Sequence, residues 1–104
     1  MVIKVRTIKF NVNQQRIKNV NSVGFIYKGT DNYLRLEFNF NSDWDGCKKA
    51  ISFGSKELAM LLEDGNTCVV PKEAFDETKL TFYLVGKKKD YRIQTQEFVI
   101  RLSN

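Results

Sequence analysis

Residues 33–40 read YLRLEFNF, and this stretch decides the fold of the chain. Every second side chain from Leu34 to Phe40 is apolar, and polar side chains lie between them. Successive side chains of a β-strand point to opposite faces, so the stretch predicts a strand with one wholly apolar face. The sequence NSDWDG follows at residues 41–46 and contains turn-forming residues and the only tryptophan, Trp44. We therefore predict a central strand followed by a tight polar loop.

Short alternating segments continue on both sides of this strand. Predicted strands cover residues 2–12, 17–20, 23–27, 47–53, 57–62, 66–70, 79–86 and 91–102. Changes of apolar register predict bulges near Arg6-Thr7 and near Gln94-Thr95-Gln96. Asp64-Gly65 predicts a hairpin that pairs residues 57–62 with 66–70. The only proline, Pro71, predicts one short helical turn that places Phe75 at an end of the fold.

These segments predict a single all-β domain over residues 1–104. Roughly seven or eight short strands with frequent turn signals and almost no helix are typical of an antiparallel β-sandwich or barrel. A chain of 104 residues is long enough to bury one core but not two. The predicted core comprises Leu34, Leu36, Phe38, Phe40, Ile51, Phe53, Leu62, Val70, Leu80, Phe82, Leu84, Phe98 and Ile100.

The charge balance narrows the classes of partner. There are 17 lysine and arginine residues against 12 aspartate and glutamate residues, a formal net charge of +5, but the charges are scattered. The densest group, Lys87-Lys88-Lys89, precedes Asp90, and we interpret it as a solvated hairpin tip. We therefore expect no nucleic-acid partner. No window approaches the roughly 18 consecutive apolar residues of a membrane span, and residues 1–6 do not resemble a signal peptide.

The residues that usually carry catalysis or bind metals are scarce. The chain contains no histidine, which removes the commonest general base and most zinc sites. We predict a protein that is not an enzyme and needs no cofactor. Asn41, Asp43, Asp45 and Gly46 match the opening of a calcium loop, but Ser52 stands where the bidentate glutamate belongs. The two cysteines, Cys47 and Cys68, lie in apolar strand patterns and are expected to be reduced core thiols. The alternative, a disulfide, requires that their two strands pair with suitable geometry.

Candidate partner-binding residues come from the basic group, from tyrosines expected to point away from the core, and from Trp44, which is expected to be partly exposed in its loop. They are Lys87, Lys88, Lys89, Tyr83, Tyr91 and Trp44, with Tyr27 and Tyr33 as further outward aromatics. Exposed aromatic side chains anchor protein interfaces or stack on sugars. Packing of tyrosines across the outer face of a sheet is the competing structural interpretation.

A longer pattern of motifs resembles a known kind of module. Its parts are Leu36–Phe40, Asp43–Gly46, Lys48 or Lys49 with Phe53, Leu62–Gly65, Cys68–Pro71 with Glu73 and Phe75, Leu80–Gly86 and Ile93–Thr95. Residues 33–96 thereby resemble a small β-sandwich module of baseplate, tail-fibre and related virion proteins from phages that infect Gram-positive bacteria. The chain ends almost as soon as the module does, whereas a fibre continues into a stalk or a head.

The resemblance implies a non-enzymatic, protein-binding module of phage origin. The leading expectation is a small virion component that self-associates or docks on other virion proteins. The alternative is an anti-defence inhibitor that occludes a bacterial immune protein, and sugar binding is a third interpretation. The implied location is the cytoplasm of the bacterial host, where the chain is synthesised, or the virion.

Overall fold

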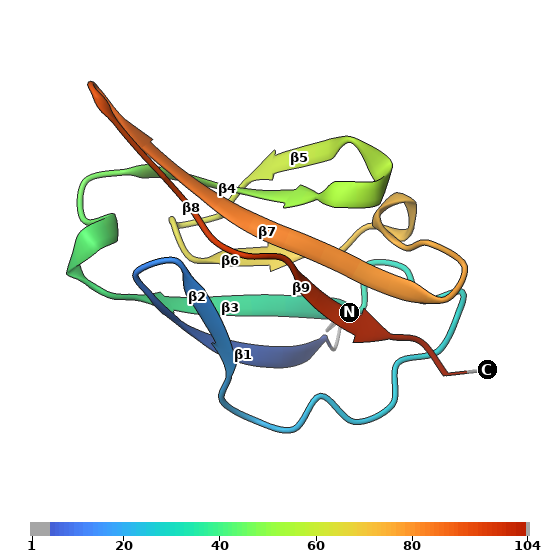
Figure 1. Ribbon diagram of the computed structural model, residues 1–104. Helices are drawn as coiled ribbons and strands as arrows, with labels where there is room; N and C mark the ends of the chain where they lie inside the picture. The colour runs from blue at the N-terminus through green and yellow to red at the C-terminus, as the bar shows by residue number, and fades with distance from the viewer. Residues whose placement is uncertain (1–4, 104) are drawn as a thin grey trace.

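The computed structural model describes residues 5–103, whose strands form two sheets packed face to face (Figure 1). The first sheet contains, in spatial order, β2 (Arg16–Asn19), β1 (Arg6–Asn13), β3 (Leu34–Phe40) and β6 (Thr67–Val69). The second contains β5 (Leu58–Leu61), β4 (Lys48–Phe53), β7 (Lys79–Lys88) and β8 (Tyr91–Gln94), with β9 (Phe98–Arg101) also pairing with β7. The predicted all-β sandwich is confirmed.

The predicted central strand is the β3 strand, which lies between β1 and β6. Its pairing with β1 is parallel, however, with Ile8 opposite Leu36 and Phe10 opposite Phe38, whereas the other named strand pairs are antiparallel. From Arg6 onward this pairing runs without interruption. The bulge predicted near Arg6-Thr7 is therefore absent from β1, and residues 2–4 of that predicted strand lie outside the described residues.

The predicted strand at 23–27 is wrong. This segment is irregular, and Tyr27 makes only an isolated bridge, to Ser103. The Arg6 guanidinium donates hydrogen bonds to the carbonyls of Val23 and Phe25, so a side chain takes up the backbone groups that a neighbouring strand would need. Ile26 is buried, whereas Phe25 and Tyr27 are exposed.

The predicted hairpin at Asp64-Gly65 is also wrong beyond its turn. Asp64 and Gly65 have the positive φ angles of 50° and 77° that suit such a turn, but only Glu63 and Thr67 pair across it. β5 then pairs with β4, and β6 pairs with β3. The turn therefore carries the chain from one sheet to the other, because the apolar residues on its two sides fill the core from opposite faces.

The predicted irregularity near Gln94-Thr95-Gln96 is confirmed. Val85 pairs with Gln94 and Phe82 pairs with Phe98, so the chain between β8 and β9 carries one residue more than the facing part of β7. Thr95 bridges the gap, because its hydroxyl accepts a hydrogen bond of 2.9 Å from the backbone N–H of Leu84. Because of the extra residue, the side chains that point into the core are at odd positions at Ile93 and at even positions at Ile100.

The core lies between the two sheets and agrees closely with the predicted one. Phe40 and Phe98 are partly buried, and the other predicted members are buried. Phe10, Phe38 and Phe82 form an aromatic cluster with ring centroids 5.4–5.8 Å apart. The helical turn predicted after Pro71 is the 3₁₀ turn η3 (Lys72–Ala74), where Ala74 is buried and Phe75 packs partly against the core.

Candidate interaction surface

Trp44 closes one end of the sandwich. It is the last residue of the 3₁₀ turn η1 (Ser42–Trp44) and has no exposed surface. Its indole Nε1 donates a hydrogen bond of 2.8 Å to the carbonyl of Gln14, in the turn between β1 and β2, and its ring centroid lies 4.9 Å from that of Phe40. On the other sheet, Gly86 makes room for the ring, because a Cβ atom there would lie 2.6 Å from Trp44 Cε3.

This burial removes Trp44 from the candidate partner-binding residues. The sequence predicts a partly exposed aromatic here, but the ring fills the space between the β1–β2 turn and Gly86. Its apolar surface is buried, and its one polar atom has a hydrogen-bond partner inside the fold. The Asp43–Gly46 loop is therefore a structural element and presents no aromatic anchor to a partner.

The same loop contacts the last residue of β7 and the first residue of β8, next to the tip of the β7–β8 hairpin, which extends beyond the neighbouring strands in Figure 1. The Tyr91 hydroxyl donates a hydrogen bond of 2.8 Å to the carbonyl of Asp43. The Lys88 ammonium donates a hydrogen bond of 2.8 Å to the carbonyl of Asp45. The Lys88 ammonium also lies 5.0 Å from the centroid of the Tyr91 ring. Partial desolvation and the nearby Asp43 carboxylate raise the pKa of Tyr91. Two of the candidate residues thus anchor the hairpin to the loop.

The side-chain oxygen of Asn41, the first residue of the calcium-like motif, is engaged elsewhere. The Asn41 side-chain oxygen accepts a hydrogen bond of 3.1 Å from the backbone N–H of Gln14, and its amide nitrogen donates to Asn13. Within residues 5–103, no group of three or more acidic, cysteine or histidine residues is arranged to hold a metal ion. Asn41 is therefore a support for the β1–β2 turn.

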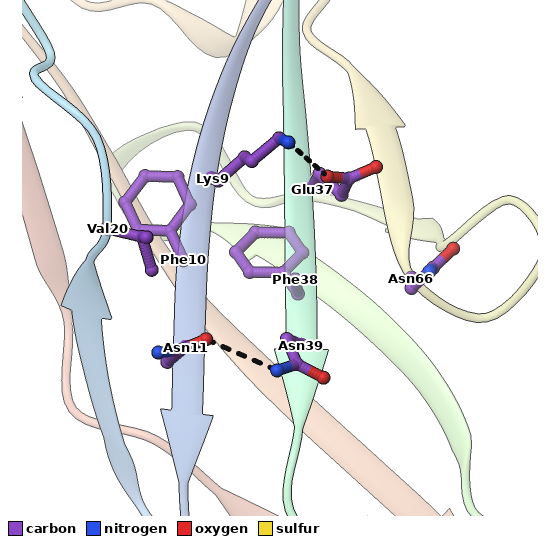
Figure 2. Close-up of a pocket in the computed structure, with 8 residues that line it drawn as sticks. All are labelled: Lys9, Phe10, Asn11, Val20, Glu37, Phe38, Asn39 and Asn66. Atoms are coloured by element: carbon purple, nitrogen blue, oxygen red, sulfur yellow. Dashed lines mark hydrogen bonds and ion pairs between the residues drawn. The ribbon is translucent and has the colours of Figure 1, made fainter.

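The outer face of the first sheet carries a shallow hollow whose polar side chains pair with one another. Figure 2 shows Lys9 beside Glu37, with 4.0 Å between their charged atoms, and Asn11 bonded to Asn39 over 3.4 Å. Val20 also lines the hollow and is 57% exposed. Because these side chains already satisfy one another across β1 and β3, the hollow leaves little unpaired charge for a ligand.

The outer face of the second sheet is different, because its register places apolar side chains in one row. Ala50 lies opposite both Leu61 on β5 and Val85 on β7. Leu61 is 71% exposed and stands on the edge strand of the sheet, which Figure 1 shows at the margin of the molecule. A hollow on this face is lined by the three residues, by Gly46 and by surrounding lysines. We call Leu61, Ala50 and Val85 the apolar row.

A row of cations lies next to the apolar row, toward the hairpin tip. Lys87 lies directly opposite Lys48 on β4 and Arg92 on β8. We call these three residues the basic row. All three are exposed, and Arg92 donates a hydrogen bond of 2.8 Å to the Gln94 side chain on its own strand. Two further lysines, Lys88 and Lys89, border the hollow at the hairpin tip.

The structure thus brings together only part of the predicted set. Lys87 belongs to the basic row and Lys89 borders the same hollow, whereas Lys88 and Tyr91 face the loop at Asp43–Asp45. Tyr83 is half-buried on the outer face, opposite Ser52. The outward aromatics Tyr27 and Tyr33 are exposed at 54% and 50%, as predicted. The predicted set does not contain Lys48, Ala50, Leu61, Val85 or Arg92, and the strand pairing that unites them has no local sequence signal.

The two cysteines are free and buried, as predicted. Cys68 lies on β6 in the first sheet, and Cys47 precedes β4 in the second. Burial, with a smaller effect of the Glu63 carboxylate, raises the pKa of the Cys68 thiol to about 11. A protonated thiol behaves here as a small apolar side chain, so Cys68 is inert at neutral pH.

This shift predicts a loss of stability in alkali. The thiolate forms at lower pH in the unfolded chain than in the folded one, so the stabilisation is complete below about pH 9 and is lost as the pH rises toward 11. Between pH 8 and pH 10.5, the free energy of unfolding should fall by about 2 kcal/mol more for the unaltered protein than for Cys68→Ala. Urea titrations at both pH values measure this difference. Parallel losses in the two proteins would contradict it.

None of the helical segments within residues 5–103 is long and apolar enough to cross a membrane. Comparisons of the chain with protein-family models, with curated proteins and with solved structures found no match. The fold and the surface described above are therefore the basis for a functional proposal.

Proposed function

We propose that this chain is a non-enzymatic, protein-binding module that contacts its partner through the outer face of the second sheet. The observation that carries the proposal is the apolar row, in which the exposed Leu61 continues through Ala50 to Val85. Contiguous exposed apolar side chains rimmed by polar ones mark interaction sites in soluble proteins. Leu61 is the natural anchor, because fully burying a leucine side chain contributes about 1.5–3 kcal/mol.

The outer face of the first sheet is less suited to an apolar partner. Its hollow is lined by the Lys9–Glu37 ion pair and by the Asn11–Asn39 hydrogen bond, so a partner would have to break or cover satisfied polar contacts. Burying such groups is unfavourable unless the partner replaces their hydrogen bonds. The apolar row demands no such replacement, which favours the second sheet as the binding face.

Site-specific photo-crosslinking tests the proposal. A photoreactive amino acid is placed at Leu61 and, as a matched control, at Val20, which is also exposed but borders the hollow on the first sheet. In the organism that carries the gene, we expect a discrete protein adduct at position 61 that is absent at position 20. No adduct at position 61, or the same adduct at both positions, would contradict the proposed face.

We further propose that the partner is a virion protein. The support for this setting is the resemblance of residues 33–96 to modules of baseplate and tail-fibre proteins. Mass spectrometry of the position-61 adduct identifies the partner, and a structural protein of a phage particle is the expected result. A bacterial immune protein in that adduct would instead favour the anti-defence alternative, and an adduct of two copies of the 12.1 kDa chain would indicate self-association.

A further inference from the structure

We infer that the segment bound by this face is acidic and carries an apolar side chain beside its carboxylates; the inference rests on the proposed function and specifies its ligand. The basic row lies alongside the apolar row on the same face of the second sheet. The cations are on β4, β7 and β8, the apolar side chains are on β5, β4 and β7, and the two rows share β4 and β7. A single ligand can therefore contact both rows at once.

The basic row is unfavourable in the free protein. Like charges directly opposite each other on neighbouring strands repel, and Lys87 has such a neighbour on both sides, in Lys48 and Arg92. The two ion pairs formed among residues 5–103 both use Glu37, on the other sheet, so neither neutralises the row. A carboxylate placed over Lys87 would relieve this repulsion and gain charge-assisted hydrogen bonds.

The spacing of the rows defines the ligand. On β4 and on β7, the members of the two rows are two residues apart, which corresponds to roughly 7 Å, and adjacent strands lie about 4.8 Å apart. In an extended peptide, side chains at positions i and i+2 point the same way and have the same roughly 7 Å separation. An extended segment with a glutamate and a leucine two positions apart can therefore place its carboxylate over Lys87 and its apolar side chain over Val85 and Ala50.

Two other occupants fit the surface less well. Proteins that bind single-stranded nucleic acid combine cations with aromatic rings on which bases stack, whereas the side chains beside this basic row are aliphatic. Tyr91, next to Arg92 in the hairpin, is 39% exposed, but its ring already contacts the Lys88 ammonium and its hydroxyl donates to the Asp43 carbonyl. A second copy of the chain would bring another basic row toward the first, with a net charge of +5 on each molecule.

Nuclear magnetic resonance titration of the full chain at low salt tests the inference. The probe is the acetylated and amidated peptide Ser-Glu-Ser-Leu-Ser-Glu-Ser-Leu-Ser, and the control peptide has lysine in place of both glutamates. We expect the acidic peptide alone to shift the backbone amides of Lys48, Ala50, Leu61, Val85 and Lys87, with an affinity that falls as salt is added.

Charge variants sharpen the test. The double variant Lys48→Glu, Lys87→Glu should bind the acidic peptide at least about 10-fold more weakly and should prefer the lysine peptide. The matched variant Lys18→Glu, Lys28→Glu has the same net charge but changes exposed lysines outside this face, and it should bind the acidic peptide as the unaltered protein does. Equal losses in the two variants would show an effect of net charge alone and would overturn the inference.

The remaining outcomes separate the inference from the proposed function. If both peptides shift the face equally, or neither does, the acidic ligand is wrong, while an adduct at position 61 still supports protein binding. If a single-stranded oligothymidylate shifts the same amides at lower concentration than the peptide, the ligand is a nucleic acid and the inference is overturned. Shifts of Leu61 and Val85 on simple dilution would assign the face to a second copy and would also overturn it.

Discussion

Replacing Trp44 by alanine is expected to lower the free energy of unfolding by about 4 kcal/mol. The ring is fully buried, and its Nε1 hydrogen bond to the Gln14 carbonyl joins the η1 turn to the β1–β2 turn. The substitution removes that bond and leaves a cavity between Phe40 and Gly86, because Gly86 has no side chain to fill it. Urea denaturation followed by circular dichroism measures the change.

Trp44→Phe provides the control for this expectation. Phenylalanine retains much of the apolar volume but cannot donate to Gln14, so we expect roughly half the loss or less. A loss below about 1 kcal/mol for Trp44→Ala would contradict the structural role of the loop, because such values are typical of exposed positions. It would also return Trp44 to the candidate partner-binding residues.

Replacing Leu61 by aspartate is expected to weaken partner binding by about 30-fold or more. An anchor residue at the centre of an interface commonly contributes at least about 2 kcal/mol, which corresponds to that factor. Aspartate removes the apolar side chain and puts a negative charge where the proposed ligand is itself acidic. Because Leu61 is 71% exposed, the free energy of unfolding should change by no more than about 0.5 kcal/mol.

The strands could be predicted from the sequence because their signal is local. Alternation from Leu34 to Phe40 and from Leu80 to Leu84 marks the buried face of β3 and of β7 without any knowledge of their partners. The same holds for the bulge near Thr95, which the change of register between Ile93 and Ile100 discloses.

Strand partners could not be predicted in the same way. The Asp64-Gly65 turn has the conformation that its sequence favours, yet the pairing on either side of it is set by long-range packing with β4 and β3. The parallel pairing of β1 with β3 depends likewise on an irregular crossover, which Arg6 stabilises through the carbonyls of Val23 and Phe25. Neither contact has a signal within a window of neighbouring residues.

The candidate surface likewise depends on strand pairing, which the sequence does not show locally. Lys87, Lys88 and Lys89 are conspicuous in the sequence, but only their strand context shows that Lys87 joins a row with Lys48 and Arg92 while Lys88 bonds to the Asp45 carbonyl. Leu61 is an apolar residue at an outward position of its strand, so it does not fit the alternation of a half-buried strand. This misfit is a local sequence signal for the apolar row.

The most direct test of the binding face compares Leu61→Asp with Val20→Asp by isothermal titration calorimetry, using the partner identified from the position-61 adduct. Both variants add one negative charge at an exposed apolar position, but Val20 borders the first sheet. Binding through the second sheet predicts a loss of about 30-fold or more for Leu61→Asp and a change of less than about threefold for Val20→Asp. Unchanged affinity of Leu61→Asp, or equal losses in both variants, would contradict it.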